Sequence, residues 1–240
     1  MSDHPEAHQA NQLGQPIGPP LPAWTPPPFP THRVIDGEYC RLEPVDPDSH
    51  AQLLFDALAA DKEGRNWTYL PYGPFDGFDE FAAWLNSIAA VEDPQFYTIV
   101  PANTGKPAGL ASYLRIDPTM GCIEVGHIHF APGIQRSPVS TEAMFLMMRN
   151  AFELGYRRYE WKCDALNAPS RKAATRLGFV YEGTFRQAFI YKGRSRDTAW
   201  FAMIDSEWPI LKSAFEAWLA ESNFDPEGRQ RRSLAACRNT

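Results

Sequence analysis

Hydrophobic and polar positions along the chain follow two periods, one typical of helices and one typical of strands. In residues 138–154, Val139, Ala143 and Leu146 recur at helical spacing, and Gly155 follows as a helix stop. Shorter runs rich in β-branched and aromatic residues, such as 122–130, have the length and composition of strands. The pattern therefore predicts a domain built from both kinds of element.

The same criteria, applied to the whole chain, give the order of these elements. Strands are expected at 39–45, 96–100, 108–116, 122–130 and 157–164 and as a pair meeting near residues 192 and 193, and helices at 46–60, 78–91, 138–154, 167–177 and 207–219. The turn at 103–106 reads as the connection of a hairpin. This order predicts a mixed α/β fold of the α+β kind around a largely antiparallel sheet.

Both ends of the chain differ in composition from the middle. Nine of the 22 prolines fall in residues 1–30, which we interpret as a proline-rich N-terminal arm. The arm is either disordered or anchored by Trp24 and Phe29 to the domain or to a partner subunit. Residues 31–224 are then the folded domain, and 225–240 a mobile polar C-terminal tail.

Composition excludes several classes of function. A net charge of −6 provides no basic surface for nucleic acid. No apolar run approaches the roughly 18 residues of a membrane span, and residues 1–12 lack the apolar core of a secretory signal, so a cytoplasmic location is expected. The four cysteines lie far apart, without the spacing of a zinc site, and we expect reduced thiols.

The start of the helix at 138–154 is suited to an anion. Ser137 is a favoured N-cap residue, and Pro138 occupies the first helical position, where its missing N–H has no consequence. The remaining amides and the positive end of the helix dipole face outward, so a phosphate could bind there. The alternative is that Ser137 only caps a structural helix.

A second short helix begins with Asn167, Pro169 and Ser170 and stops at Gly178. The pattern Asn167-x-x-Ser170, the run Arg176-Leu-Gly-Phe179, Glu182-Gly and the segment 192–197 (Lys-Gly-Arg-x-Arg-Asp) follow one another. With these motifs the sequence resembles the Gcn5-related N-acetyltransferases (GNAT), in their RimJ/RimL-like branch, over roughly residues 38–208. The resemblance implies the acyl-CoA N-acyltransferase fold, with central strands that splay apart.

The resemblance also implies that acetyl-coenzyme A is a co-substrate, held between the strand ending at Phe130 and the strand ending near Asp164, and that no metal is used. The family pattern for the pyrophosphate loop is Gln/Arg-x-x-Gly-x-Gly/Ala. This chain departs from that pattern at Pro138 and Ser140. The residues that the resemblance implies as cofactor-binding are Phe130, Gln135, Arg136, Ser137, Val139, Ser140, Thr141, Asn167 and Ser170. Hydroxyl groups and the Arg136 charge are expected to replace the contacts that the two departures remove.

Transfer of an acetyl group to an amine requires a polarised thioester and a proton for the departing thiolate. Backbone amides near Phe130 and Ala131 are expected to polarise the thioester carbonyl. Ser170 is the candidate proton donor. Many members of the family place a tyrosine four residues after this serine, where the chain has Ala174.

Glu124 is the first candidate for the general base, since the family often has an acid on this strand. The alternative is that Glu124 pairs with a neighbouring arginine across the sheet. His127 and His129 share one strand face, but two histidines are weak evidence for a metal, and His127 suits the substrate pocket better. Tyr72, in an aromatic loop, and Asp164 are further candidates for binding the acceptor amine.

These observations predict an N-acetyltransferase that transfers the acetyl group directly in a ternary complex. An α-amine with a pKa of about 8 needs about 1.4 kcal/mol for deprotonation at pH 7, against about 4.6 kcal/mol for a lysine, which favours a weakly basic acceptor. The acceptor is a small-molecule amine or a protein N-terminus, and homodimer formation is left open. The competing hypotheses are a non-catalytic acyl-coenzyme A-binding module and an assembly protein whose arm binds a partner.

Overall fold

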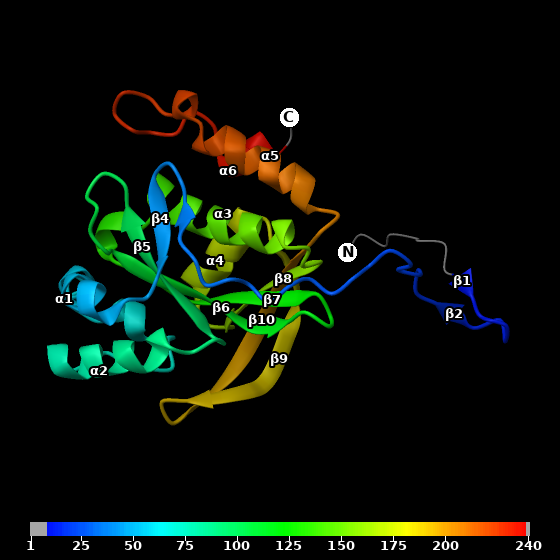
Figure 1. Ribbon diagram of the computed structural model, residues 1–240, viewed down its shortest axis with the longest axis horizontal. Helices are drawn as coiled ribbons and strands as arrows, with labels where there is room; N and C mark the ends of the chain where they lie inside the picture. The colour runs from blue at the N-terminus through cyan, green and yellow to red at the C-terminus, as the bar shows by residue number, and fades with distance from the viewer. Residues whose placement is uncertain (1–8, 239–240) are drawn as a thin grey trace.

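A computed structural model describes residues 9–238 of the 240-residue chain (Figure 1). An eight-stranded sheet has the order β3-β4-β5-β6-β7-β8-β10-β9. Its strands are β3 (Ile35–Asp36), β4 (Cys40–Pro44), β5 (Gln95–Pro101), β6 (Gly109–Asp117), β7 (Cys122–Phe130), β8 (Arg158–Asp164), β9 (Val180–Tyr191) and β10 (Arg194–Ile204). Every neighbouring pair is antiparallel except β7 and β8, which run parallel. The predicted mixed, mostly antiparallel fold is confirmed.

Helices cover both faces of this sheet (Figure 1). The α-helices are α1 (Pro47–Leu58), α2 (Phe78–Ala89), α3 (Pro138–Glu153), α4 (Ala168–Leu177), α5 (Trp208–Leu219) and α6 (Leu234–Cys237). Single-turn 3-10 helices occur at η1 (Arg65–Trp67), η2 (Pro132–Ile134) and η3 (Glu221–Asn223). Polar caps start several of them; the side chain of Asp46, for example, accepts a hydrogen bond from the Asp48 amide ahead of α1.

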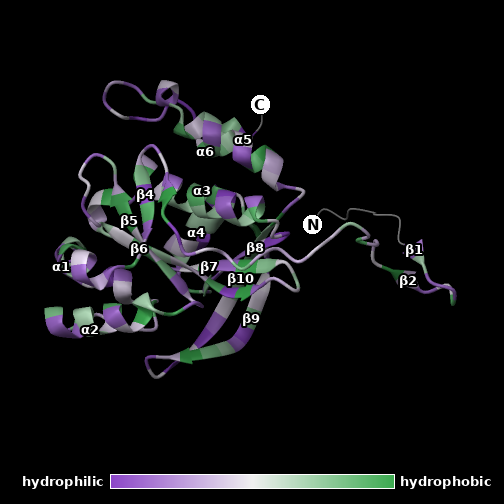
Figure 2. Ribbon diagram, viewed as in Figure 1, coloured by the Kyte–Doolittle hydropathy of each residue, from purple (hydrophilic) through white to green (hydrophobic). Residues whose placement is uncertain are grey.

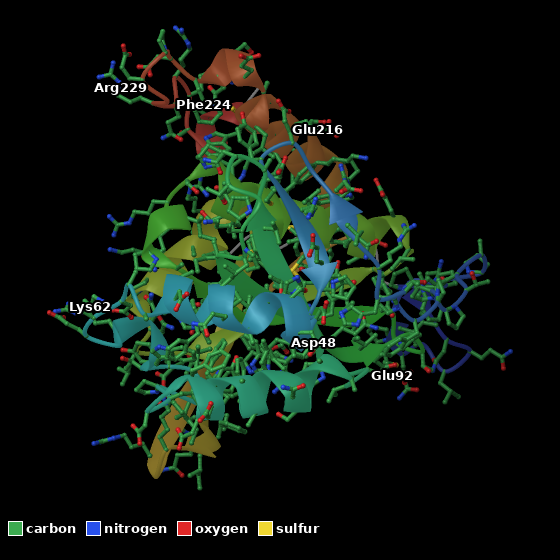
Figure 3. The ribbon with its side chains drawn as sticks, turned by 60° about the vertical axis from the view of Figure 1, so that its left-hand side comes forward. Asp48, Lys62, Glu92, Glu216, Phe224 and Arg229 are labelled. Atoms are coloured by element: carbon green, nitrogen blue, oxygen red, sulfur yellow. The ribbon has the colours of Figure 1, made fainter. Side chains whose placement is uncertain are left out.

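Two apolar cores lie on the two sides of the sheet. The larger core joins α3, α4 and α5 to the central strands, with Tyr113, Tyr159 and Phe215 fully buried. The smaller core joins α1, α2 and the loop between them to β5 and β6, around Leu54 and Phe81. Hydrophobic segments accordingly concentrate where helices meet the sheet (Figure 2), and labelled charged side chains such as Asp48, Lys62 and Glu216 lie on the outside (Figure 3). None of the described helices has the length and apolar character needed to cross a membrane.

The N-terminal arm has two parts. Residues 9–17 form a small hairpin of β1 (Gln9–Ala10) and β2 (Pro16–Ile17), which projects away from the body (Figure 1). Further along, Pro27 is buried, and the Pro30 carbonyl accepts a hydrogen bond from Gln95 Nε2 at 2.8 Å. The Tyr156 hydroxyl also donates to the Pro28 carbonyl, so the second half of the arm lies on the domain, near the starts of β5 and β8.

The C-terminal segment folds back onto α5. Leu234 and Cys237 of α6 are buried in the larger core. The side-chain amide of Asn223 donates to the carbonyls of Trp218 and Arg232, which links η3 to the segment that leads into α6. Residues assigned to a polar tail from composition alone thus contribute apolar contacts to the domain.

Candidate active site

The two parallel strands β7 and β8 are paired along only part of their length. Their register joins Cys122 to Arg158 and continues as far as Val125 and Trp161, where it ends. Beyond that point β8 remains paired with β10, up to Asp164 opposite Thr198, and β7 remains paired with β6. The strands therefore part in the middle of the sheet, as the splayed-strand prediction requires.

A bulge in β7 marks the point of parting. Gly126 pairs with Ser112 and His129 with Leu110, so β7 has one residue more than β6 between these pairs, and His127 has a φ of 53°. The added residue shifts the alternation of β7, so His129 faces the same side of the sheet as Glu124. It also reorients the backbone that follows.

The amides of β7 after the bulge alternate between β6 and the gap. Ala131 N–H donates to the Ala108 carbonyl at 2.9 Å, and alternation then directs the amides of Phe130 and Ile128 away from β6, toward the gap. The Phe130 carbonyl points the same way and accepts from Gln135 Nε2 at 3.0 Å. The expectation that Ala131 would polarise a thioester is therefore wrong, because its amide is already bonded. The Ile128 amide, which the sequence did not indicate, points to the same side as the Phe130 amide.

The start of α3 is capped more tightly than the sequence indicated. Ser137 and Ser140 form a reciprocal capping box, and the hydroxyls of Ser137, Ser140 and Thr141 donate to the carbonyls of Ile134, Ser137 and Ser137 respectively. These hydroxyl protons are thus committed within the protein, which contradicts the expectation that they would replace lost phosphate contacts. Among the described residues, the Val139 amide meets no acceptor, and Arg136 is exposed with a φ of 56°.

The start of α4 faces the other side of the gap. The side chain of Asn167 accepts from the Ser170 amide at 3.1 Å and caps the helix. Trp161 Nε1 donates to Ser170 Oγ at 3.0 Å, so this hydroxyl is an acceptor for the indole, while its own proton is directed toward the neighbouring Cys163 sulfur. The helix offers no side-chain proton donor at position 174, which is a fully buried alanine.

Glu124 lies in the paired half of the strands and is 3% exposed. Its carboxylate is 2.8 Å from Arg115 Nη1 and 2.8 Å from Lys162 Nζ, and Lys162 is also 2.7 Å from Glu160. Arg158 extends the series by binding both Glu160 and Glu182. Pairing with an arginine, which the sequence left open as the alternative for Glu124, is thus present. The sequence gave no indication that Lys162 belongs to this group, although it lies two residues before Asp164 on β8 and therefore on the same face of the sheet as Asp164.

His129 is buried and His127 is half-buried, and both pack against the loop that links α1 to α2. The Tyr72 hydroxyl lies 3.1 Å from His127 Nδ1, and the two rings stack at 5.6 Å. Burial, with a smaller contribution from the Arg115 charge, lowers the pKa of His127 to about 4. Burial also lowers the pKa of His129 to about 4, and within the described chain neither of its ring nitrogens has a hydrogen-bond partner. Both side chains are therefore neutral near pH 7.

Asp164 is at the end of β8 and is 5% exposed. One carboxylate oxygen accepts from the Leu166 amide at 2.8 Å, and the other from the Tyr191 hydroxyl at 2.8 Å. The side chain thus holds the turn into α4 and the tip of the β9–β10 hairpin. These bonds leave it poorly placed to take up a cationic amine as well.

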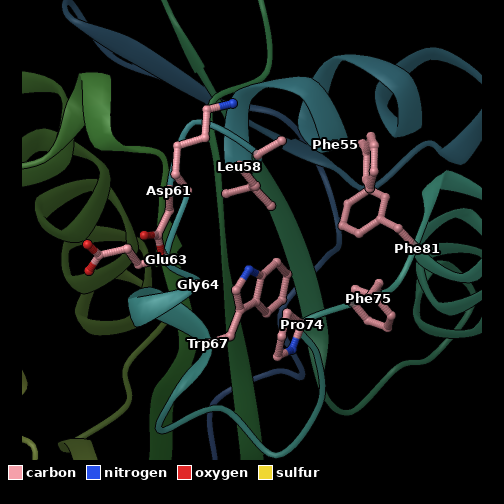
Figure 4. Close-up of a pocket in the computed structure, with 11 residues that line it drawn as sticks. Phe55, Leu58, Asp61, Glu63, Gly64, Trp67, Pro74, Phe75 and Phe81 are labelled. Atoms are coloured by element: carbon pink, nitrogen blue, oxygen red, sulfur yellow. The ribbon is translucent and has the colours of Figure 1, made fainter.

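Two hollows lie near these elements. One, of about 620 Å³, is next to the start of α3 and is lined in part by Tyr39, Ser137 and Val139. The other, of about 310 Å³, lies between α1, α2 and their loop, with the Trp67 indole near its centre and Phe81 on one side (Figure 4). Trp67 separates this second hollow from His129, whose ring centroid is 4.1 Å away.

In the part of the chain that the structure describes, no group of three or more histidine, cysteine or acidic side chains could hold a metal ion. The groups nearest the gap are instead backbone amides of β7 and the Ser170 hydroxyl, and the ion-paired side chains lie in the adjoining paired half of the strands. Such a set can bind an extended polar ligand and stabilise a developing oxyanion.

Comparison with known proteins supplies an independent line of evidence. Residues 40–180 match the family model of the acetyltransferase (GNAT) domain. A GCN5-related N-acetyltransferase from Brucella melitensis is 46% identical, with a TM-score of 0.90 over 92% of this chain and 100% of that one. A probable acetyltransferase of the GNAT family from Chromobacterium violaceum is 41% identical, with a TM-score of 0.76 over 81% and 98% of the two chains.

More distant structures share the fold. An acetyltransferase from Salmonella typhimurium that modifies the N-terminal serine of the 50S ribosomal subunit protein L7/L12 is 21% identical, with a TM-score of 0.62 over 72% of this chain and 99% of that one. No curated protein matched the sequence.

Proposed function

The chain belongs to the GNAT family of acetyltransferases, and from this premise we propose that it transfers the acetyl group of acetyl-coenzyme A directly to the primary amine of a small molecule. The observation that carries the proposal is the parting of β7 and β8 after Val125 and Trp161. It leaves the amides of Ile128 and Phe130 facing a gap that an extended amide-containing ligand can enter as an added strand.

The residues around the gap have distinct roles in this proposal. The Ile128 amide donates to the thioester carbonyl oxygen and stabilises the charge that forms there as the amine nitrogen bonds to the carbonyl carbon. When the carbon–sulfur bond breaks, the Ser170 hydroxyl supplies a proton to the sulfur. The Trp161 indole holds Ser170 Oγ in place, and the positive end of the α4 dipole favours the thiolate.

Removal of a proton from the amine is assigned to Glu124, acting through water. Its position two residues before the strands part supports this role. Lys162 and Arg115 hold the carboxylate in one orientation. Because these cations occupy the carboxylate, the amine proton reaches it through a water molecule and not by direct contact. His127 and Tyr72 border the same face and are proposed to contact the acceptor.

Direct transfer is favoured over a covalent acetyl-enzyme. Cys163 is the cysteine nearest to Ser170, it is buried, and burial raises the pKa of its thiol. A protonated, buried thiol is a poor nucleophile. We expect Cys163→Ala to retain most of the activity, and complete loss would argue for the covalent route.

A protein N-terminus remains the alternative acceptor, since the Salmonella enzyme of the same fold acts on one. A non-catalytic coenzyme A-binding module is a second candidate, because Pro138 and the committed hydroxyls reduce the phosphate contacts at α3. A coenzyme A titration, followed by thiol release from acetyl-coenzyme A over a panel of amines and N-terminal peptides, separates these functions. Turnover on small amines supports the proposal, turnover on peptides alone supports the N-terminal enzyme, and binding without turnover supports the module.

A further inference from the structure

One cation on the acceptor side of the sheet differs from its neighbours. Lys162, Arg158 and Arg115 each lie within 2.8 Å of a carboxylate. Arg196, on β10, is half-buried, yet no carboxylate of residues 9–238 comes within 4 Å of its guanidinium. A half-buried guanidinium without a carboxylate partner is a candidate binding site for an anionic group.

The Arg196 side chain is held in a defined position. Its Nε donates to Thr198 Oγ1 at 3.1 Å, and its guanidinium lies 5.8 Å from the ring centroids of both Phe189 and Tyr191. Within residues 9–238, Nε is thus the only guanidinium nitrogen of Arg196 that donates a hydrogen bond, and the terminal nitrogens stay available for a bidentate ligand. Two nearby acids have other partners: Asp164 accepts from the Tyr191 hydroxyl, and Asp197, the next residue along the chain, accepts from the Gln187 amide.

Arg196 also lies close to the gap. Thr198 is the partner of Asp164, the last residue of β8, so Arg196 is two residues, about 7 Å, further along β10. Thr198, Trp200 and Lys162 share its face of the sheet, because Lys162 packs over the Trp200 ring at 3.8 Å. An acceptor whose nitrogen reaches the thioester therefore has its remaining groups within reach of this guanidinium.

Aromatic rings continue this surface. Phe185 stacks on Trp200 with centroids 4.4 Å apart and is 54% exposed, and Phe189 is 46% exposed. Exposed apolar side chains that form one contiguous patch can mark a surface that a ligand or partner covers. The exposed rings and the guanidinium together suit a molecule with an apolar body and an anionic group.

Resting on the proposed function, we infer that Arg196 binds the carboxylate of the acceptor, and that the acceptor is an amine carrying a carboxylate beside an apolar group, as in an apolar α-amino acid. Arg196 is a substrate-binding residue in this scheme and takes no part in proton transfer. It selects acceptors through paired hydrogen bonds, which a simple amine or a peptide N-terminus cannot form.

The test compares acceptors that differ only in the carboxylate. With the full-length protein and acetyl-coenzyme A, kcat/KM is measured for L-phenylalanine, 2-phenylethylamine and an N-terminal phenylalanyl peptide amide. Wild type is expected to prefer L-phenylalanine by roughly 10- to 100-fold, the range for a charge-assisted pair. Arg196→Met is expected to abolish the preference mainly through KM, Arg196→Lys to retain part of it, and Arg186→Met, an exposed control on β9, to leave it unchanged.

Each outcome decides the inference. If Arg196→Met lowered kcat/KM equally for L-phenylalanine and 2-phenylethylamine, Arg196 would have a structural role and the inference would be overturned. A wild-type enzyme that acetylates 2-phenylethylamine or the peptide as efficiently as the amino acid would also overturn it. Absence of turnover on every acceptor, with coenzyme A still bound, would instead overturn the proposed function on which the inference rests.

Discussion

The paired and the parted halves of β7 and β8 belong to the same two strands, but they differ in whether their charged and polar groups have partners. In the paired half, Arg115, Glu124, Lys162 and Glu160 form a continuous series of ion pairs. In the parted half, the polar groups lack such partners: the amides of Ile128 and Phe130 face the gap, and the ring nitrogens of His129 meet no partner in the described structure. In the paired half the removal of one partner would leave a buried charge uncompensated, whereas the unpaired polar groups of the parted half are where a ligand gains most.

The largest expected effect concerns His129 in the parted half. Its pKa in the folded state, about 4, is below the ordinary value of 6.5, so between these pH values the unfolded chain binds a proton that the folded chain does not. Stability should therefore fall as the pH drops through this window, by about 2 to 3 kcal/mol between pH 7 and 4.5 for this residue.

The variant His129→Leu should remove that part of the pH dependence and change stability little at pH 7, because the unpaired nitrogens contribute no hydrogen bonds. Urea unfolding of both proteins across this range measures the difference. Parallel loss of stability in the two proteins would show that the histidine is not held neutral.

The next effect tests the paired half. Lys162→Met leaves Glu124 and Glu160, which are register partners, without the cation between them. Arg115 and Arg158 still hold one carboxylate each, so the expected loss is about 2 kcal/mol, below the 3 to 5 kcal/mol of a fully uncompensated pair.

Denaturant unfolding of Lys162→Met should be compared with that of Lys212→Met, which removes a partly exposed ion pair with Glu153. The control should lose about 0.5 kcal/mol or less. If the two variants are equally stable, the series of ion pairs does not stabilise the sheet.

Ser170 tests the chemistry at the gap. Ser170→Ala removes the hydroxyl assigned to protonate the thiolate, and we expect kcat to fall about tenfold with little change in KM for acetyl-coenzyme A. Thiol-release kinetics measure this, with Cys163→Ala as the neighbouring control that stays active. Unchanged kcat in Ser170→Ala would transfer the role to water.

The smallest effect is expected at the phosphate loop. With the hydroxyls of the α3 start already committed, Arg136 provides charge at an exposed site, and Arg136→Ala should weaken coenzyme A binding about threefold at low salt and not at high salt. Calorimetric titration tests this, with Arg229→Ala as a distant exposed control (Figure 3). Identical affinity at low salt would place the pyrophosphate elsewhere.

Most of the fold followed from the sequence, because apolar spacing and caps are local. The helix predicted at 138–154 is found at Pro138–Glu153, and the strand at 122–130 is found unchanged. The parting of the strands came only from the family resemblance. Periodicity cannot show where pairing between distant segments ends.

Details of the site depended on contacts between distant segments. The amide of Ala131 is bonded because Ala108 lies opposite, and Asp164 is occupied because the β9–β10 hairpin brings Tyr191 to it. The sequence predicted Glu124 as a site residue, but its Lys162 partner, and the lack of a carboxylate partner for Arg196 among residues 9–238, follow from strand register. Register is fixed by the whole sheet, so no local motif reveals them.

The proposed activity depends above all on the gap between β7 and β8 holding coenzyme A against the backbone of β7. Amide hydrogen exchange by NMR tests this residue by residue, with and without saturating coenzyme A. We predict that the amides of Ile128 and Phe130 become at least about tenfold better protected when coenzyme A binds, while Ile123 and Val125, inside the paired half, stay as they are. Bound coenzyme A with unchanged exchange at Ile128 and Phe130 would contradict the account.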